Sequence, residues 1–384
     1  MKLVADSGLW TTAPTRAAPP LIAVLEVSGA VLSWIVDEPP GGGAGEMTFT
    51  DLARADWLWR LVGESGHVAV VSALEDAAIT TQPSRRIDLA GVNVAPGSVD
   101  ALRRLAVGHW LRRWWPASRQ DGIPRLDRAL LDVEIALLTA AAQSYFSDDT
   151  FDSDVTELLS AHGSALAARM RGGDPRVLGL ARAAAGLADE VGVDDPAWAD
   201  LSAALQDSSA IPDLPSGRRD DYALAAGAGG GARGATEIAR GVASIRWSAV
   251  PPGIFDAGEN TVEWNIEVAD AAVLAVVRVA IIGPGLPTGI AVQLRSGAFS
   301  CAGALDADGR AVLPLVDAQG QPVTESAAWD HDWSVTSVDV GAPLSEATET
   351  PEARERLRRW ARARLDRPAD DAFLAEILAA ESAY

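Results

Sequence analysis

The stretch TVEWNIEVA, residues 261–269, alternates apolar and polar side chains. Apolar residues stand at every second position from Val262 to Val268, and charged or amide side chains stand between them. Because successive residues of a β-strand point to opposite faces of a sheet, this period of two predicts a strand with one buried and one solvated face. Trp264 lies on the apolar face, so we expect its side chain in a hydrophobic core.

Similar short runs surround this strand and predict an antiparallel β-sandwich over residues 242–341. Glycine, proline and aspartate separate the runs, and the turn 306–309 is typical of a hairpin between the two runs that flank it. The predicted strands cover residues 245–249, 261–269, 273–282, 290–294, 299–305, 310–316 and 333–340.

The N-terminal region, residues 1–116, mixes both kinds of secondary structure and is predicted to form an α+β domain. Residues 1–20 are rich in proline and alanine and are expected to be irregular. The predicted strands cover residues 22–27, 30–36, 67–72 and 87–94, and the predicted helices cover residues 51–62 and 99–115.

Helical patterns follow in the next part of the chain and return at its end. Residues 117–215 repeat apolar side chains at three- and four-residue steps, which predicts a helical bundle. Residues 216–241 are glycine-rich and predict a linker, and residues 342–384 predict two helices, at 352–365 and 371–380. The predicted fold class is therefore α+β and multidomain: an N-terminal mixed α/β region, a central helical bundle, and a C-terminal antiparallel β-sandwich followed by helices.

The composition is that of a globular and strongly acidic protein. The 384 residues are 48% hydrophobic and carry a net charge of −21, which disfavours binding to nucleic acid or to an anionic membrane. The single cysteine excludes an intrachain disulfide, and we identify neither a signal peptide nor a membrane span. A cytoplasmic location is therefore expected. Many alanines and arginines with only one lysine suggest a bacterial source with a GC-rich genome.

Two stretches resemble ligand sites in spacing only. Residues 229–236 have the glycine and threonine spacing of a phosphate-binding loop, but Ala235 stands where that loop needs a lysine. The acids between Asp148 and Asp154 could hold a divalent cation, but acids are also favoured at the positive end of a helix dipole, which is the simpler explanation. We therefore predict no cofactor and no metal site.

The most distinctive short motif is WDHDW, residues 329–333. Asp330 or Asp332 could orient His331 for acid–base chemistry, and the fold could bring Cys301 close, which would give a hydrolase. The simpler explanation is that the tryptophans anchor a loop and that Cys301 is a small buried hydrophobic residue. No catalytic residue is therefore assigned.

Two helices combine arginine with tryptophan in an otherwise acidic chain. Between Glu352 and Arg367, seven arginines against three acids give +4, which leaves −25 for the rest of the chain. Such helices either dock on the protein's own acidic surface or bind a partner, because arginine and tryptophan are typical interface anchors. The residues predicted to bind a partner are Arg112, Arg113, Trp114, Trp115, Arg354, Arg358, Trp360 and Arg362.

The function expected from these features is that of a non-enzymatic adaptor or regulatory component of a bacterial multiprotein system. Its partner would be a protein with an acidic surface, and its oligomeric state is left open. The alternative is a hydrolase with a site assembled around His331 and Cys301.

Overall fold

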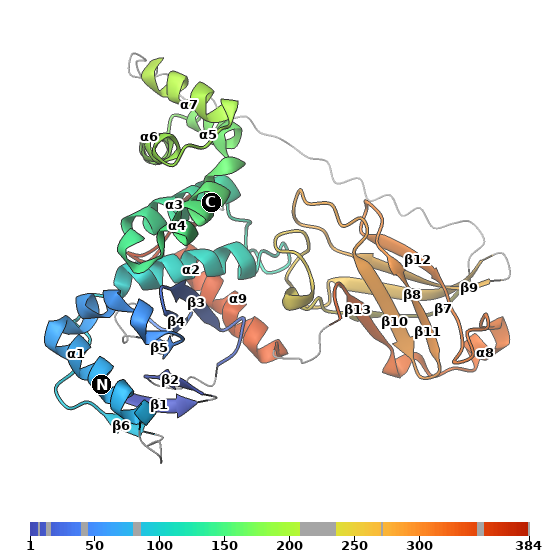
Figure 1. The fold of residues 1–384 in the computed structure, drawn as a ribbon. Coiled ribbons are helices and arrows are strands. Elements are labelled where there is room, and N and C mark those ends of the chain that lie inside the picture. Colours follow the sequence, from blue (N-terminus) through green and yellow to red (C-terminus); the bar gives the residue numbers. More distant parts are fainter. Residues whose placement is uncertain are drawn as a thin grey trace. The chain divides into compact units, whose positions relative to one another are not determined.

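The computed structural model describes all residues except 7, 13–16, 40–44, 80–85, 208–235, 270–271, 344–348 and 383–384. The chain forms two compact units (Figure 1). Residues 1–113, 126–214 and 363–384 form the mixed unit, and residues 114–125 and 215–362 form the β unit. Three antiparallel sheets together with the helices confirm the predicted α+β, multidomain class. The boundaries of these two units do not coincide with those of the five predicted segments, and each unit contains residues from several of them.

A six-stranded antiparallel sheet in the order β3-β4-β5-β2-β1-β6 lies in the mixed unit. The predicted strands 22–27 and 30–36 are confirmed and form a hairpin at its edge, since Val24 of β3 pairs with Ser33 of β4. Residues 1–20 are not all irregular, because they contain the first two strands. The strands are β1 (Lys2–Asp6), β2 (Leu9–Thr11), β3 (Ile22–Val27), β4 (Ala30–Ile35), β5 (Glu46–Phe49) and β6 (Arg86–Asp88).

The predicted helix 51–62 is wrong in its first part, because 3-10 helices at Leu52–Arg54 and Asp56–Leu58 precede α1. By contrast, α6 begins as its capping residues indicate. Asp174 accepts a hydrogen bond from the amide of Arg176, and Pro175 occupies the first helical position of α6. The helices are α1 (Trp59–Ile79), α2 (Asp100–Trp114), α3 (Arg128–Ala141), α4 (Asp148–Ser160), α5 (Gly163–Met170), α6 (Pro175–Glu190), α7 (Pro196–Asp207) and α10 (Leu374–Ser382). The predicted strand 67–72 is wrong, because these residues lie in α1.

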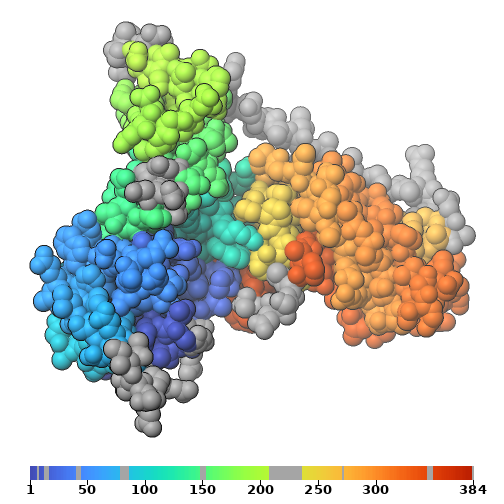
Figure 2. Space-filling view, in the orientation of Figure 1, coloured from blue at the N-terminus to red at the C-terminus, as the bar shows by residue number. Residues whose placement is uncertain are grey.

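The β unit contains two antiparallel sheets, a four-stranded one in the order β12-β9-β8-β7 and a three-stranded one in the order β11-β10-β13. Figure 2 shows this part of the chain, in yellow to orange, as closely packed side chains. Its elements are β7 (Thr236–Ala243), β8 (Val262–Ala269), β9 (Ala272–Val279), β10 (Ala291–Ser296), β11 (Phe299–Ala304), β12 (Arg310–Pro314), α8 (Glu325–Trp329), β13 (Ser337–Val340) and the greater part of α9 (Pro351–Asp366).

Residues from both sheets share one hydrophobic core. The apolar side of β8 contributes Trp264, which is 7% exposed, so its predicted core position is confirmed. Gly241 on β7 pairs with Trp264, and a Cβ atom added at this glycine would overlap the indole ring. A glycine opposite the tryptophan therefore makes room for the large ring within the sheet.

Four predictions for this block are corrected by the structure. The predicted strand 333–340 is a strand only at Ser337–Val340, because Trp333–Val335 form a 3-10 helix. The turn 306–309 exists, but β11 and β12 do not form a hairpin, because β11 pairs with β10 whereas β12 pairs with β9. The predicted strand 245–249 contains a 3-10 helix at Trp247–Ala249. The last residues of the predicted linker, from Thr236, belong to β7, and residues 216–235 lie outside the described part of the chain.

None of the helices in the described part of the chain has the length and apolar character that crossing a bilayer requires.

Candidate functional site

The inner face of α9 is fixed to the β unit by buried arginines. Arg354 donates two hydrogen bonds to the carboxylate of Glu259, at 2.9 and 3.0 Å, and a third to Glu349 at 3.3 Å. Arg358 donates to Glu259 at 2.9 Å and lies 3.3 Å from the carboxylate of Asp121. The Arg358 side chain is only 3% exposed. These two arginines therefore hold the helix against its own unit and are not presented on the surface.

The carboxylates that receive these arginines come from distant parts of the sequence. Glu259 precedes β8, Glu349 precedes α9, and Asp121 lies between Ser118 and Ile123, which pair with each other as an isolated β-bridge. Burial raises the pKa of Glu259, but hydrogen bonds from Arg354, Ser244 and Arg358 outweigh it and bring that pKa down to about 2. Glu259 is therefore ionised at neutral pH and is the central anion of this network.

The depressed pKa of Glu259 predicts how stability changes in acid. Its usual pKa is 4.5 and its folded-state pKa is about 2, so its stabilising effect is complete above about pH 5 and is lost as the pH falls towards 2. We expect wild type to be more stable than Glu259→Gln at pH 7, and this difference to shrink between pH 4.5 and 2.5 in urea titrations. An equal difference at pH 3 and pH 7 would show that the pKa of Glu259 is not depressed.

The outer face of α9 carries a different set of arginines. Arg356 is exposed and also has an interaction within the chain. The Arg359 side chain is 71% exposed, and the carboxylate of Glu355 lies 3.9 Å away. The side chain of Arg362 is partly buried, and it lies 3.3 Å from the carboxylates of both Asp121 and Glu355. Trp360 is half-buried and has an interaction within the chain. Arg354 and Arg358 were predicted to bind a partner, but both are buried within the β unit. Arg356 and Arg359 face outward on α9, and the sequence analysis did not include them among the partner-binding residues.

The basic end of α2 is also engaged within the chain. Arg112 lies 2.9 Å from Asp132, a buried carboxylate on α3 that also receives Arg128 at 2.7 Å and His162 at 3.0 Å. Burial raises the pKa of Asp132, but His162 and the two arginines outweigh it and lower that pKa. Arg112 therefore stabilises the packing of α2 on α3.

The other residues predicted to bind a partner at the end of α2 are Arg113, Trp114 and Trp115, which follow Arg112 in the sequence. The indole nitrogen of Trp115 donates to the carbonyl of Pro124 at 2.8 Å, so this tryptophan anchors the segment 114–125 of the β unit. Arg113 and Trp114 are half-buried and each has an interaction within the chain.

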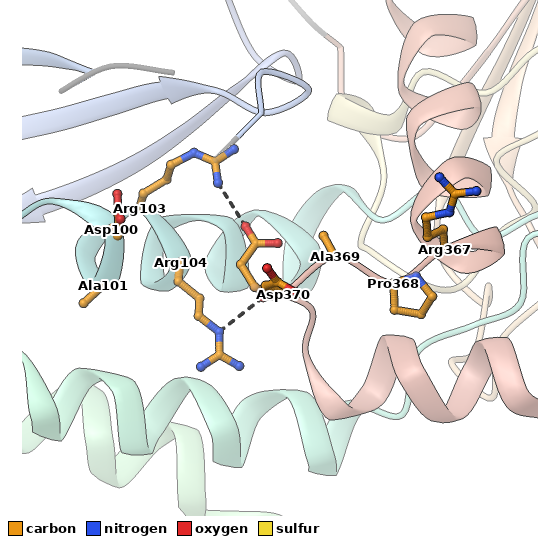
Figure 3. Close-up of a pocket in the computed structure, with 9 residues that line it drawn as sticks. Asp100, Ala101, Arg103, Arg104, Arg367, Pro368, Ala369 and Asp370 are labelled. Carbon is orange, nitrogen blue, oxygen red and sulfur yellow. Dashed lines mark hydrogen bonds and ion pairs between the residues drawn. The ribbon is translucent and has the colours of Figure 1, made fainter. Parts of the chain in front are cut away.

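A hollow of about 760 Å³ opens in the mixed unit between the first turns of α2 and the connection that precedes α10 (Figure 3). Arg103 donates to Asp371 at 3.0 Å, and Arg104 donates to the carbonyl oxygen of Asp371 at 3.2 Å (Figure 3). The size suits a small molecule. However, Arg103 and Arg104 already donate hydrogen bonds to Asp371, which also lines the hollow, so they are not assigned to a ligand. The lining residues are Asp100, Ala101, Arg103, Arg104, Arg367, Pro368, Ala369, Asp370 and Asp371.

His331 of the WDHDW motif packs against two aromatic rings and forms a hydrogen bond with a serine. The ring centroids of Phe299 and Trp333 lie 4.5 and 4.6 Å from that of His331. Its Nε2 atom is 2.9 Å from Oγ of Ser296, a residue that sequence reasoning missed. Asp332 instead accepts from the amide of Ser334, so it caps a short helix and does not orient the imidazole.

Ser296 links His331 to a second hydroxyl in a short hydrogen-bond chain. The hydroxyl of Thr336 has two neighbours, the carbonyl of Trp333 at 2.8 Å and Oγ of Ser296 at 3.0 Å. These contacts fix the position of the imidazole ring within the β unit.

Cys301 is a buried member of the β-unit core. It is 5% exposed, and burial raises the pKa of its thiol to about 11. A reactive cysteine needs a lowered pKa and access to solvent, because the thiolate is the nucleophile. The described contacts of Cys301 therefore favour the prediction of a small buried hydrophobic residue over the hydrolase alternative.

The environment of Cys301 predicts slow alkylation. We expect iodoacetamide to label native protein at pH 7.5 far more slowly than protein in 6 M guanidinium chloride, because the folded thiol is both buried and protonated. Mass spectrometry of the peptide that contains Cys301 measures both rates. Labelling of the native chain as fast as of the denatured chain would show an accessible, activated thiol.

The predicted acidic cluster lies at the start of α4, at Asp148–Ser160, where a helix dipole favours acids. Among the described residues no group of three or more histidine, cysteine or acidic side chains is placed to hold a metal ion. Ser147 occupies the N-cap position of this helix.

Comparison with protein-family models, with curated proteins and with solved structures found no match.

Proposed function

We propose that this protein is a non-enzymatic adaptor or regulatory component of a bacterial multiprotein system, acting in the cytoplasm. Its partner would be a protein with an acidic surface, which docks on the outer face of α9 around Arg356 and Arg359. The observation that carries the proposal is the division of arginines on this helix. Arg354 and Arg358 are buried against carboxylates of the same unit, whereas the guanidinium of Arg359 is 71% exposed.

This division supports binding for a physical reason. The buried arginines fix the position of the helix, so little conformational freedom of the backbone would be lost when a partner binds. Exposed arginines present donors that match carboxylate pairs, and they raise association rates with acidic partners more than they raise affinity. The end of α2 is not part of the proposed surface, because Arg112 and Trp115 are held by contacts inside the chain.

The hydrolase alternative has weaker support. Cys301 is buried with a raised thiol pKa, and the contacts of His331 are with Ser296, Phe299 and Trp333.

The test compares two charge-reversed variants of the tagged full-length protein in the organism that encodes it. We expect Arg356→Glu with Arg359→Glu to lose one or more copurifying proteins, while its thermal unfolding stays close to that of wild type. Arg240→Glu with Arg278→Glu changes the net charge equally at exposed positions of β7 and β9 and should retain these proteins. Equal copurification by both variants would remove the outer face of α9 from the proposal.

A further inference from the structure

Two tryptophans with strongly exposed side chains differ in what lies over their rings. Trp59, at the start of α1, is 43% exposed, and the guanidinium of Arg60 lies 4.7 Å from its ring centre. Trp329, at the end of α8, is 50% exposed, and no cation lies over its ring among the described residues. The face of an indole ring attracts cations, so Trp59 has its own cation whereas Trp329 presents an open face.

Contacts of the neighbouring residues hold the backbone around Trp329 in place. Ala328 is fully buried in the core of the β unit, and Thr324 caps α8 by accepting from the amide of Ala327 at 3.3 Å. The indole nitrogen of Trp333 donates to the carbonyl of Ala328 at 2.9 Å. The segment is therefore anchored on both sides of Trp329, and the exposed ring is presented by an ordered backbone.

The surroundings of Trp329 are acidic. The indole nitrogen donates to Glu325 at 3.3 Å, which places this carboxylate beside the ring. Asp330 follows directly and is exposed, and its side chain makes no hydrogen bond or ion pair within the described residues. The sequence contains no lysine and no arginine from residue 311 to residue 353. Two acids of this stretch, Asp339 and Glu349, pair with arginines from outside it, whereas Glu325 and Asp330 form no ion pair within the described residues.

We propose that Trp329, Glu325 and Asp330 form a docking surface for a basic polypeptide segment, whose arginine or lysine side chain stacks on the indole ring. An open aromatic face recognises the delocalised or ammonium cation, and the adjacent carboxylates accept its N–H groups. Nucleic acid is excluded as the occupant by the sign of this charge. The surface is distinct from the outer face of α9 and has the opposite charge, so an adaptor with both faces binds two partners of different chemistry.

The test measures binding of a labelled peptide to the full-length chain by fluorescence anisotropy. The probe is fluorescein-GRGRGRG-amide, and its control is the same peptide with citrulline, a neutral analogue, in place of each arginine. We expect wild type to bind the arginine peptide and not the citrulline peptide. Trp329→Ala should weaken binding by roughly 2- to 30-fold, the range of cation–π contributions between exposed and desolvated sites.

Two matched variants separate this surface from the general acidity of the chain. Trp59→Ala removes an exposed tryptophan whose ring already carries Arg60, and should bind as wild type does. Glu325→Gln with Asp330→Asn should weaken binding more than Glu64→Gln with Glu75→Gln, a pair of exposed acids on α1 with the same charge change. No binding by wild type, or equal binding by Trp329→Ala and Trp59→Ala, would overturn the proposal.

Discussion

Replacing Arg358 by alanine is expected to lower the free energy of unfolding of the β unit by about 3–5 kcal/mol, the usual cost of removing one partner from a buried ion pair. Arg358 is 3% exposed and is close to three carboxylates, those of Glu259, Asp121 and Glu355. Without the guanidinium these acids would lose the buried cation that they share. Among the described residues, Glu259 would keep Arg354 as its one arginine partner.

The neighbouring residue offers a control on the same helix. Arg359→Ala removes an identical side chain that is 71% exposed, so a change of about 0.5 kcal/mol or less is expected, as for most surface substitutions. Urea unfolding followed by circular dichroism measures both variants. Equal losses of stability would mean that the two faces of α9 do not differ in burial, and the assignment of Arg358 to the interior would be wrong.

Replacing Trp264 by alanine is expected to cost about 3–5 kcal/mol, because it empties a large aromatic site in a packed core. The side chain is 7% exposed and belongs to the core shared by the two sheets of the β unit. The adjacent Glu263 is exposed on the other face of β8, so Glu263→Ala should change stability by about 0.5 kcal/mol or less.

Denaturant titration of the two variants tests the alternation that predicted this strand. A loss below about 1 kcal/mol for Trp264→Ala would place the tryptophan outside the core. Gly241→Ala is an independent check from the paired strand, because its methyl group would overlap the same ring without removing any core atom.

Sequence reasoning succeeded where the pattern and the packing are both local. The alternation around Trp264 lies within a single strand, and the cap and proline of α6 determine its first turn. Sequence reasoning failed where the same apolar run is compatible with both a strand and a helix. The run 67–72 is as apolar as a strand, but Val70 and Leu74 are buried at a spacing of four residues, which is the period of one helix face.

Long-range pairing was the part that the sequence could not predict. The turn 306–309 has the residues of a hairpin, but turn chemistry does not determine which sheet the following strand joins. The arginines of α9 were identified as important, but their partners are remote, since Glu259 and Arg354 are 95 positions apart. Without those carboxylates, helical spacing alone could not separate the buried arginines from the exposed ones.

The most direct test of the proposed role of α9 is arginine footprinting with phenylglyoxal, read by mass spectrometry. It compares the purified protein with the complex isolated from its host. In the purified protein, Arg359 should react quickly and Arg354 and Arg358 slowly, since the inner guanidinium groups are buried in ion pairs. In the complex, Arg356 and Arg359 should become protected. Unchanged reactivity of these two residues in the complex would contradict a partner on the outer face of α9.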